Sequence, residues 1–227
     1  TQCADKVKVR DYIRDTIGEK YLIPHLGIYD NPKDIDFDVL PDQFVIKTNW
    51  GSGQNIICEK KSELDIPKTI KQLQKWLRPK SNHYYNSFEW CYKNISPKII
   101  IETYIKDSDD LPDYKFFCCN GEPKFMFIAQ DRSKGHDHLK FTFFDIAFNR
   151  LPFSQHYPTN PNPIKKPELW NEMLQLSRTL SAPFPLVRVD FYITNGALKV
   201  GELTFCHFAG MTPFEPREWD YKLGDFL

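Results

Sequence analysis

Two Asn-Gly dipeptides, at positions 120–121 and 195–196, constrain the fold of this chain more than any other feature. Each separates two runs rich in β-branched and aromatic residues, and Asn-Gly in that setting is the strongest short-range signal for a β-hairpin. Antiparallel pairs of strands are therefore the basis of the fold. The two hairpins are predicted over Asp113–Cys119 with Lys124–Gln130, and over Leu186–Ile193 with Leu198–Phe205.

The remaining elements are predicted from hydrophobic periodicity and from the positions of Pro and Gly. Further strands are expected at Phe44–Lys47, Asn55–Cys58, Lys98–Ile105 and Leu139–Asp145, and helices at Asp5–Lys20, Pro67–Leu77 and Pro167–Leu180. Loops are expected at Tyr21–Pro41 and Leu151–Pro167, and an irregular tail at Glu215–Leu227. Antiparallel hairpins with a few helices between them define an α+β fold class.

Composition limits the classes of function. The chain has 227 residues, of which 41% are apolar, which is enough for one large domain or two smaller lobes. Thirty basic and thirty acidic residues leave no net charge, so neither nucleic acid nor an anionic membrane is favoured as the main partner. No apolar run approaches the length of a bilayer span, so stable membrane insertion is not expected. Six irregularly spaced cysteines predict free thiols in a reducing cytoplasm.

The register of the second hairpin follows from which face must be buried. A two-residue loop at 195–196 would pair Asp190 with Gly201 and leave both faces mixed. A three-residue loop at 195–197 would pair Asp190 with Glu202 and make the opposite face entirely apolar. Because a slip of one residue exchanges the two faces, the hydrophobic pattern predicts the three-residue loop.

The predicted register gathers charge on one face of the hairpin. Asp190 and Glu202 become cross-strand neighbours, and like charges in that position are destabilising unless a cation joins them or one pKa is raised. Mg²⁺ usually takes one or two carboxylates together with substrate phosphates. Arg188, on the same face, could bind a phosphate through two hydrogen bonds, and its neighbour Thr204 adds a hydroxyl. The pattern indicates either a Mg²⁺-phosphate site or a solvated polar face with an ordinary Arg–Asp pair.

The segment from Lys47 to Gly53 is a second candidate. Its small residues, Gly51, Ser52 and Gly53, would let successive backbone N–H groups point at an anion, and Lys47 at the strand end could reach a phosphate. The order of a Walker loop is absent, since a strand and not a helix follows. The segment is either a phosphate-binding loop or an ordinary hairpin turn.

These pieces occur in a recognisable order. Lys47 and the Gly-Ser-Gly loop come first, then a strand ending in Glu102-Thr-Tyr-Ile, then Asp113-Tyr-Lys-Phe-Phe, and last Arg188-Val-Asp190 and Gly201-Glu202-Leu-Thr204. This order resembles the ATP-grasp nucleotide-binding fold, and most of all its TupA-like branch, which is linked to teichuronopeptide and other bacterial surface polysaccharides. The segments most similar to that branch are Leu40–Lys47, Asp113–Gly121, Val187–Phe191, Gly201–Phe205 and Glu218–Gly224.

The resemblance implies roles for single residues. For the nucleotide, it implies phosphate contacts from Arg10 and Lys47, a lid formed by Gly51, Ser52 and Gly53, a strand against adenine with Glu102, Tyr104 and Ile105, and a ribose contact from Asp113. For catalysis, it implies Arg188 on the transferred phosphoryl group and Lys115 on phosphate or substrate. For Mg²⁺, it implies Asp190, Glu202 and Thr204, the last in place of the Asn that the wider fold usually has. His207 would lie beside the acceptor substrate.

The resemblance also implies two α+β lobes with ATP held between their antiparallel sheets. The expected division is an N-terminal helix and connector at 1–43, left over from an N-terminal lobe, a small lobe with the Gly-rich loop at 44–105, and a large lobe with the Mg²⁺-phosphate site at 106–227. The implied location is the cytoplasm, near the inner face of the membrane.

The implied activity is that of an ATP-dependent ligase with ATP and Mg²⁺ as cofactors. It would join a small-molecule or glycan carboxylate acceptor to an amine, through an acyl phosphate, in the synthesis of capsule, O-antigen or teichuronopeptide. Nucleic acid is not an expected partner. Three alternatives remain: a sugar or polysaccharide kinase on the same ATP site, a catalytically silent nucleotide- or glycan-binding module, and a metal-dependent glycosyltransferase using the Asp-x-Asp spacings at 34–38 and 107–109.

Overall fold

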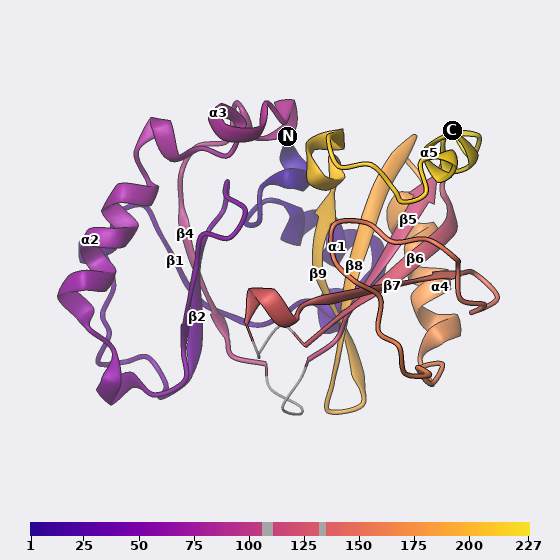
Figure 1. Ribbon diagram of the computed structural model, residues 1–227. Coiled ribbons are helices and arrows are strands. Elements are labelled where there is room, and N and C mark those ends of the chain that lie inside the picture. Colours follow the sequence, from indigo (N-terminus) through magenta and orange to yellow (C-terminus); the bar gives the residue numbers. More distant parts are fainter. Residues whose placement is uncertain (106–110, 132–134) are drawn as a thin grey trace. The chain divides into compact units, whose positions relative to one another are not determined.

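The computed structural model describes residues 1–105, 111–131 and 135–227, with the backbone alone at His136. The Asp-x-Asp spacing at 107–109 and the predicted lobe boundary at 106 lie outside the described residues. The chain divides into two compact units, which are residues 1–12 with 23–105 and residues 13–22 with 106–227 (Figure 1). Helix α1 (Val9–Ile17) is shared between them.

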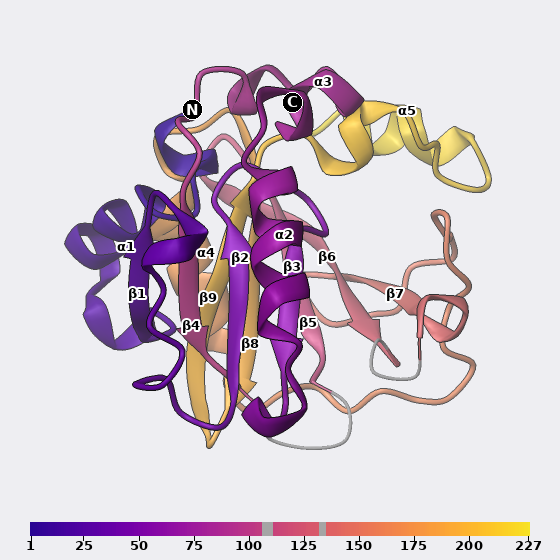
Figure 2. The same cartoon turned by 90° about the vertical axis from the view of Figure 1, so that its left-hand side faces the viewer.

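Unit 1 is built on a four-stranded antiparallel sheet in the order β1-β4-β2-β3. The strands are β1 (His25–Tyr29), β2 (Phe44–Thr48), β3 (Asn55–Cys58) and β4 (Ile99–Thr103). Helix α2 (Ile66–Trp76) runs along one face, as Figure 2 shows, and its buried Leu73 packs with Phe44, Ile46 and Ile101. Since strand residues alternate between faces, Val45 and Lys47 point away from this core. A short helix, α3 (Tyr84–Ser87), follows α2.

The N-terminal part of unit 1 differs from the prediction. The stretch expected to be a loop contains β1, which pairs antiparallel with β4. The connection from β1 to β2 adds Ile35, Phe37 and Leu40 to the buried core of this unit. The pattern was not readable as a strand because β1 is a short edge strand with Pro24 before it and Gly27 within it. Residues 23–43 lie in unit 1 together with β2, β3 and β4.

Unit 2 is built on a five-stranded antiparallel sheet in the order β7-β6-β5-β8-β9. The strands are β5 (Asp113–Cys119), β6 (Glu122–Gln130), β7 (Lys140–Asp145), β8 (Leu186–Thr194) and β9 (Ala197–Thr204). Helix α4 (Trp170–Ser181) covers one face, where Trp170 lies 5.3 Å from the ring of Phe116. Fully buried Val187, Val189 and Phe191 of β8 belong to that face.

The opposite face of the unit 2 sheet is aromatic on its β6–β7 side. Phe125, Phe127 and Phe143 form a core there with the C-terminal residues Trp219 and Leu223. The tail predicted to be irregular contains helix α5 (Glu218–Gly224). Its seven residues give too little periodicity to identify a helix from the sequence. Among the described residues, no helix combines the length and the apolar character needed to cross a membrane.

The β8–β9 hairpin combines both of the registers that the sequence allows. The predicted pairing of Asp190 with Glu202 is confirmed, as is the pairing of Arg188 with Thr204. The predicted three-residue loop is wrong, because Thr194 pairs with Ala197 and leaves a two-residue turn.

Asn195 and Gly196 form that turn with φ values of 49° and 69°. Positive φ at both positions is the hairpin turn that matches the twist of the strands. A β-bulge between the turn and the site shifts the register by one residue, so the two-residue turn and the pairing of Asp190 with Glu202 occur in the same hairpin. Asp190 faces Glu202 while Phe191 faces Val200, so Gly201 is the extra residue.

Replacing Gly201 with Ala is expected to lower the free energy of unfolding by about 1–3 kcal/mol. A Cβ at this position would lie 2.7 Å from Cε2 of Tyr192, which is closer than packed atoms approach. Urea denaturation of the variant measures the effect. In a Tyr192→Ala background the same substitution should cost much less. An equal cost in both backgrounds would show that this contact is not the constraint.

Candidate functional site

Cross-strand pairing among β5, β8 and β9 places polar residues of unit 2 on one face of the five-stranded sheet. Lys115 pairs with Asp190, and Asp190 pairs with Glu202 on its other side. Two residues earlier on β8, Arg188 pairs with Thr204. Because cross-strand partners share a face and residues two apart share a face, all five side chains lie together. They are on the face opposite α4.

Arg188 is the centre of this group. Its Nε and Nη2 atoms donate to the two oxygens of Asp190, both at 2.7 Å. Nη2 also donates to Oγ1 of Thr204 at 2.9 Å and lies 3.4 Å from Oε1 of Glu202. Arg188 is only 8% exposed and Asp190 only 1%. This bidentate contact fixes the plane of the guanidinium in a place that water hardly reaches.

Lys115 adds a second cation to Asp190. Its Nζ donates to Oδ2 of Asp190 and lies 3.3 Å from Oδ2 of Asp113, and all three residues are buried. Glu202 brings a third carboxylate close to the two cations Lys115 and Arg188. Carboxylates gathered this closely favour a cation beside them, because a nearby opposite charge stabilises the ionised form of each.

Opposing effects set the charge of Arg188. Burial lowers the pKa of its guanidinium, but the charge and hydrogen bonds of Asp190, with the charges of Glu202 and Asp113, outweigh burial and raise that pKa. Arg188 therefore stays positively charged although it is buried.

A neutral histidine holds the remaining terminal nitrogen of Arg188. Nη1 donates to Nδ1 of His207, and Nε2 of His207 lies 2.8 Å from Oε1 of Gln155. Since Nδ1 accepts, the ring carries its proton on Nε2 and donates it to Gln155. Nε2 of Gln155 donates in turn to the backbone oxygen of Thr212 at 2.8 Å. Burial, with the positive charges of Arg188 and Lys115, lowers the pKa of His207 to about 2.

The oxygen atoms of this face suit a hard divalent cation. Asp190 accepts three hydrogen bonds, one on Oδ1 and two on Oδ2, and a carboxylate offers about four lone-pair sites. Oδ1 can therefore take one more ligand. Oε1 of Glu202 and Oγ1 of Thr204 lie 3.2 Å apart beside it in the ladder. A set of oxygens that includes two carboxylates is of the kind that Mg²⁺ binds.

In unit 1, two cations meet at a buried carboxylate. Nζ of Lys47 lies 2.6 Å from Oε2 of Glu102, and Nη1 of Arg10 lies 3.3 Å from Oε1. Nη2 of Arg10 donates to the backbone oxygen of Ile23 at 2.9 Å and lies 3.2 Å from Nδ1 of His25. Two cations thus meet at one carboxylate, an arrangement that suits the binding of an anionic group.

The loop after β2 is anchored by two side chains. Nε1 of the buried Trp50 donates to the backbone oxygen of Trp76 at 3.2 Å. Nε2 of Gln54 donates to the backbone oxygen of Ser81 at 2.7 Å. Trp50 is thus a packing residue, which ties the loop to the end of α2.

The glycines of this loop have different surroundings. Gly51 is buried, and a Cβ there would lie 2.4 Å from Cδ of Gln54, so a larger residue would require the Gln54 side chain to move. Lys6 donates to the backbone oxygen of Gly51 at 2.9 Å. Ser52 and Gly53 are exposed and form the tip. The Gly-rich segment is therefore a closely packed base with an exposed tip.

The structure brings most of the predicted site residues into two groups, one in each unit. In unit 2 these are Asp113, Lys115, Arg188, Asp190, Glu202, Thr204 and His207, and in unit 1 they are Arg10, Lys47 and Glu102, with Gly51, Ser52 and Gly53 in the loop that follows β2. Tyr104 is separate, since its hydroxyl donates to Oε1 of Glu59 at 3.0 Å, and Ile105 is half-buried after β4.

Two further residues were not found from the sequence. Gln155 lies in a Pro-rich stretch that reads as a connection, and no spacing links it to His207. Lys6 lies in an N-terminal segment whose charge pattern is unremarkable. Neither residue belongs to a motif, so only the folded chain reveals their contacts.

A family model for TupA-like ATP-grasp proteins matches residues 1–227. The chain belongs to this family. No protein among curated sequences matches it. The fold prediction, α+β of ATP-grasp type, is confirmed, because solved ATP-grasp structures are similar to it throughout.

Three solved structures illustrate the likeness. D-alanine–D-alanine ligase from Bacillus anthracis, complexed with ATP, has a TM-score of 0.53 and 18% identity over 89% of this chain and 55% of its own. The D-alanine–D-alanine ligase from Coxiella burnetii has a TM-score of 0.54 and 14% sequence identity, over 96% of this chain and 52% of the ligase chain. N5-carboxyaminoimidazole synthase from Aspergillus clavatus, in complex with ADP and a ribonucleotide, has a TM-score of 0.50 and 12% sequence identity, over 92% of this chain and 46% of the synthase chain. The chain thus spans less than two-thirds of these proteins.

The buried, neutral state of His207 predicts a loss of stability in acid. Below about pH 6.5, the unfolded chain binds a proton at His207 that the folded chain does not, so the free energy of unfolding falls as the pH falls. From about pH 6.5 to about pH 5 this residue should account for about 1–2 kcal/mol. Urea denaturation across this range should show a shallower pH dependence for His207→Gln. His138→Gln, at an exposed position, is the control, and equal slopes for wild type and His207→Gln would contradict the assignment.

Proposed function

We propose that this chain is the catalytic part of an ATP-dependent ligase that joins a carboxylate to an amine through an acyl phosphate. One observation carries the proposal: a buried, permanently charged Arg188 held beside the oxygens of Asp190, Glu202 and Thr204, in a chain of the TupA-like ATP-grasp family. Phosphoryl transfer depends mainly on positioning and charge neutralisation, and this group offers both.

Nucleotide binding falls to unit 1 in this proposal. Lys47 and Arg10 both contact Glu102, so two cations lie together and would contact the α- and β-phosphate oxygens. The tip at Ser52 and Gly53 would contribute backbone N–H groups to the phosphates. In unit 2, Asp113 would contact the ribose, as the resemblance implies.

The first chemical step transfers the γ-phosphoryl group. An oxygen of the acceptor carboxylate attacks the γ-phosphorus, the bond to the β–γ bridging oxygen breaks, and ADP leaves. Arg188 neutralises charge on the phosphoryl group, with Lys115 beside it. Asp190, Glu202 and Thr204 would hold Mg²⁺, which would supply further charge neutralisation.

The second step forms the amide. The amine attacks the carbonyl carbon of the acyl phosphate, the bond to the phosphate oxygen breaks, and inorganic phosphate leaves with loss of a proton from the amine. Because His207 is neutral, it adds no positive charge to the site. Its role is to orient Arg188, and Gln155 orients His207 in turn. The family name points to surface-polysaccharide synthesis. We extend the proposal to a uronic acid or amino acid as acceptor and to the cytoplasm, near the inner face of the membrane, as the location.

The test traps the acyl phosphate without knowledge of the amine. The chain is incubated with Mg²⁺, ATP and a panel of carboxylates (glucuronate, galacturonate, glutamate), with hydroxylamine as the nucleophile. ATP-dependent hydroxamate, formed in step with ADP, is expected for at least one carboxylate. ADP release with hydroxyl acceptors and no hydroxamate would replace the ligase with a sugar kinase. ATP binding without any turnover would replace it with a binding module.

Lys47→Met should weaken ATP binding about 10- to 100-fold, since a charge-assisted contact contributes about 1.5–3 kcal/mol. Titration calorimetry gives the affinities. Lys60→Met is the matched control, because Lys60 also lies in unit 1 and pairs with Glu63 at 2.6 Å, as Lys47 does with Glu102. Equal affinities for the two variants would remove Lys47 from the nucleotide site.

A further inference from the structure

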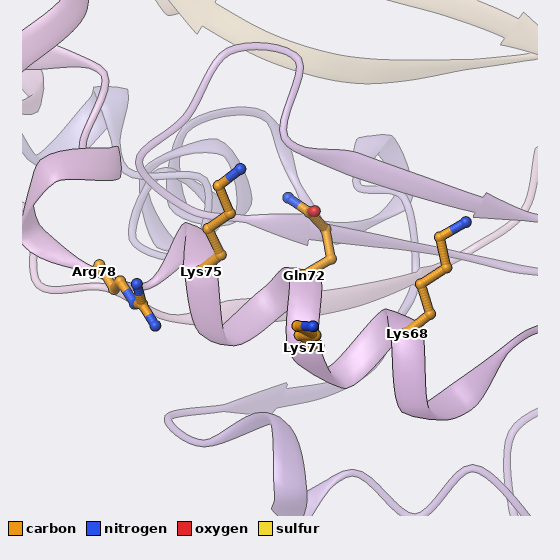
Figure 3. Close-up of a pocket in the computed structure, with 5 residues that line it drawn as sticks. All are labelled: Lys68, Lys71, Gln72, Lys75 and Arg78. Carbon is orange, nitrogen blue, oxygen red and sulfur yellow. The ribbon is translucent and has the colours of Figure 1, made fainter.

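Helix α2 carries a basic stripe, which is Lys68, Lys71, Lys75 and Arg78. The four side chains are exposed and, with Gln72, line a shallow hollow of about 340 Å³. Figure 3 shows Lys68, Gln72 and Lys75 extending to the same side of the helix. With a rise of about 1.5 Å per residue, the stripe is about 15 Å long. It is therefore a linear array of cations on the surface of unit 1.

The zero net charge of the chain conceals this stripe. Residues 66–80 contain five Lys or Arg and no Asp or Glu, so the remainder of the chain carries five net negative charges. Within the described residues, no ion pair involves any of the four side chains. Lys71 and Lys75 are four residues apart, a spacing at which like charges destabilise a helix. Lys75 lies in the last turn of α2, where a cation is favourable, but no acidic partner among the described residues offsets the repulsion along the stripe, which is consistent with a binding role.

Exposed aromatic side chains form a second feature of unit 1. Tyr85, Phe88 and Trp90 are 58%, 79% and 64% exposed. The ring of Tyr84 packs edge-on against all three, with centroids 5.3, 6.3 and 5.9 Å away. Nζ of Lys93 lies 4.0 Å from the ring centre of Trp90. The group, here called the aromatic cluster, is thus assembled and yet open to solvent.

The backbone beneath the aromatic cluster is firmly held. The buried Asn82 donates to the backbone oxygen of Tyr92 and accepts from the backbone N–H of Tyr84, both at 2.9 Å. Phe88 has φ of 58° at the end of α3, a conformation that Gly or Asn adopts at lower cost. A strongly exposed aromatic residue therefore stands where packing does not require it and where the backbone disfavours it.

The basic stripe and the aromatic cluster adjoin. The 3₁₀ helix η5 (Pro79–Ser81) follows α2 directly and contacts α3. Oγ of Ser81 donates to the backbone oxygen of Lys75 at 2.7 Å, and the backbone N–H of Tyr85 donates to Asn82. Figures 1 and 2 both place α3 beyond the C-terminal end of α2.

We propose that the basic stripe and the aromatic cluster form a peripheral docking surface for an anionic lipid bilayer. Lys and Arg would contact the phosphate headgroups, while the rings of Phe88 and Trp90 would enter the interface between headgroups and acyl chains. Stable attachment of a peripheral protein takes two such signals, one electrostatic and one apolar. A soluble polyanion would account for the stripe, whereas an anionic bilayer accounts for both the stripe and the exposed apolar ring of Phe88 beside it.

Vesicle sedimentation tests the proposal. The whole chain is mixed with vesicles of phosphatidylcholine, with or without phosphatidylglycerol. Binding is expected only with phosphatidylglycerol, and added salt should weaken it. Lys68→Gln/Lys71→Gln/Lys75→Gln should bind about 100-fold more weakly, since each Lys near the surface contributes about 5-fold. The matched control replaces three exposed lysines outside the stripe, Lys8, Lys33 and Lys165, with Gln.

A second variant tests the apolar contribution. Phe88→Asn suits the local backbone, so it should fold normally and bind vesicles about 10-fold more weakly. Met211→Asn, at a residue 82% exposed, is the control. Unchanged binding by either the triple Lys variant or Phe88→Asn would overturn the proposal. So would binding to soluble polygalacturonate as tight as binding to phosphatidylglycerol vesicles. ATP binding, measured on the same samples, reports separately on the proposed function.

Discussion

The buried bidentate ion pair between Arg188 and Asp190 is the interaction on which the site of unit 2 depends. Removing two charges from water costs more than their attraction returns unless the remaining donors and acceptors are also satisfied. Here Lys115 also donates to Asp190, and His207 and Thr204 accept from Arg188. Because each partner is itself held, Arg188 has one orientation before any ligand arrives, which is the condition for electrostatic preorganisation.

This polar face is stable because the other face of the same strands is a core. Val187, Val189 and Phe191 alternate with Arg188 and Asp190, and they pack beneath α4. The alternation requires one register at the site, while Asn195 and Gly196 require another at the turn. The bulge at Gly201 satisfies both requirements at the cost of one unpaired residue. The bulge thus allows the Asn195-Gly196 turn and the pairing of Asp190 with Glu202 in one hairpin.

Much of this was predictable because the signals are local. The strands around each Asn-Gly, the pairing of Asp190 with Glu202 and the ATP-grasp class follow from alternation and motif order. The elements β1 and α5 could not be predicted, because a short edge strand and a seven-residue helix give too little periodicity. The bulge could not be predicted either, because the sequence pattern was compatible with each register separately. The Gln155–His207 contact also escapes, since it joins residues 52 positions apart through no motif. The roles of the grouped side chains stay predictions.

The most direct measurement is titration calorimetry of ATP with and without Mg²⁺ on the parent chain, on Glu202→Gln and on Glu122→Gln. Glu202 is 37% exposed and tolerates neutralisation better than the buried Asp190, while Glu122 is a paired carboxylate of the same sheet, 53% exposed. If the oxygens of Asp190, Glu202 and Thr204 bind Mg²⁺, then Mg²⁺ strengthens ATP binding to the parent and to Glu122→Gln, and this gain in affinity falls sharply in Glu202→Gln. An equal gain in all three, or no ATP binding by the folded parent, would contradict this assignment.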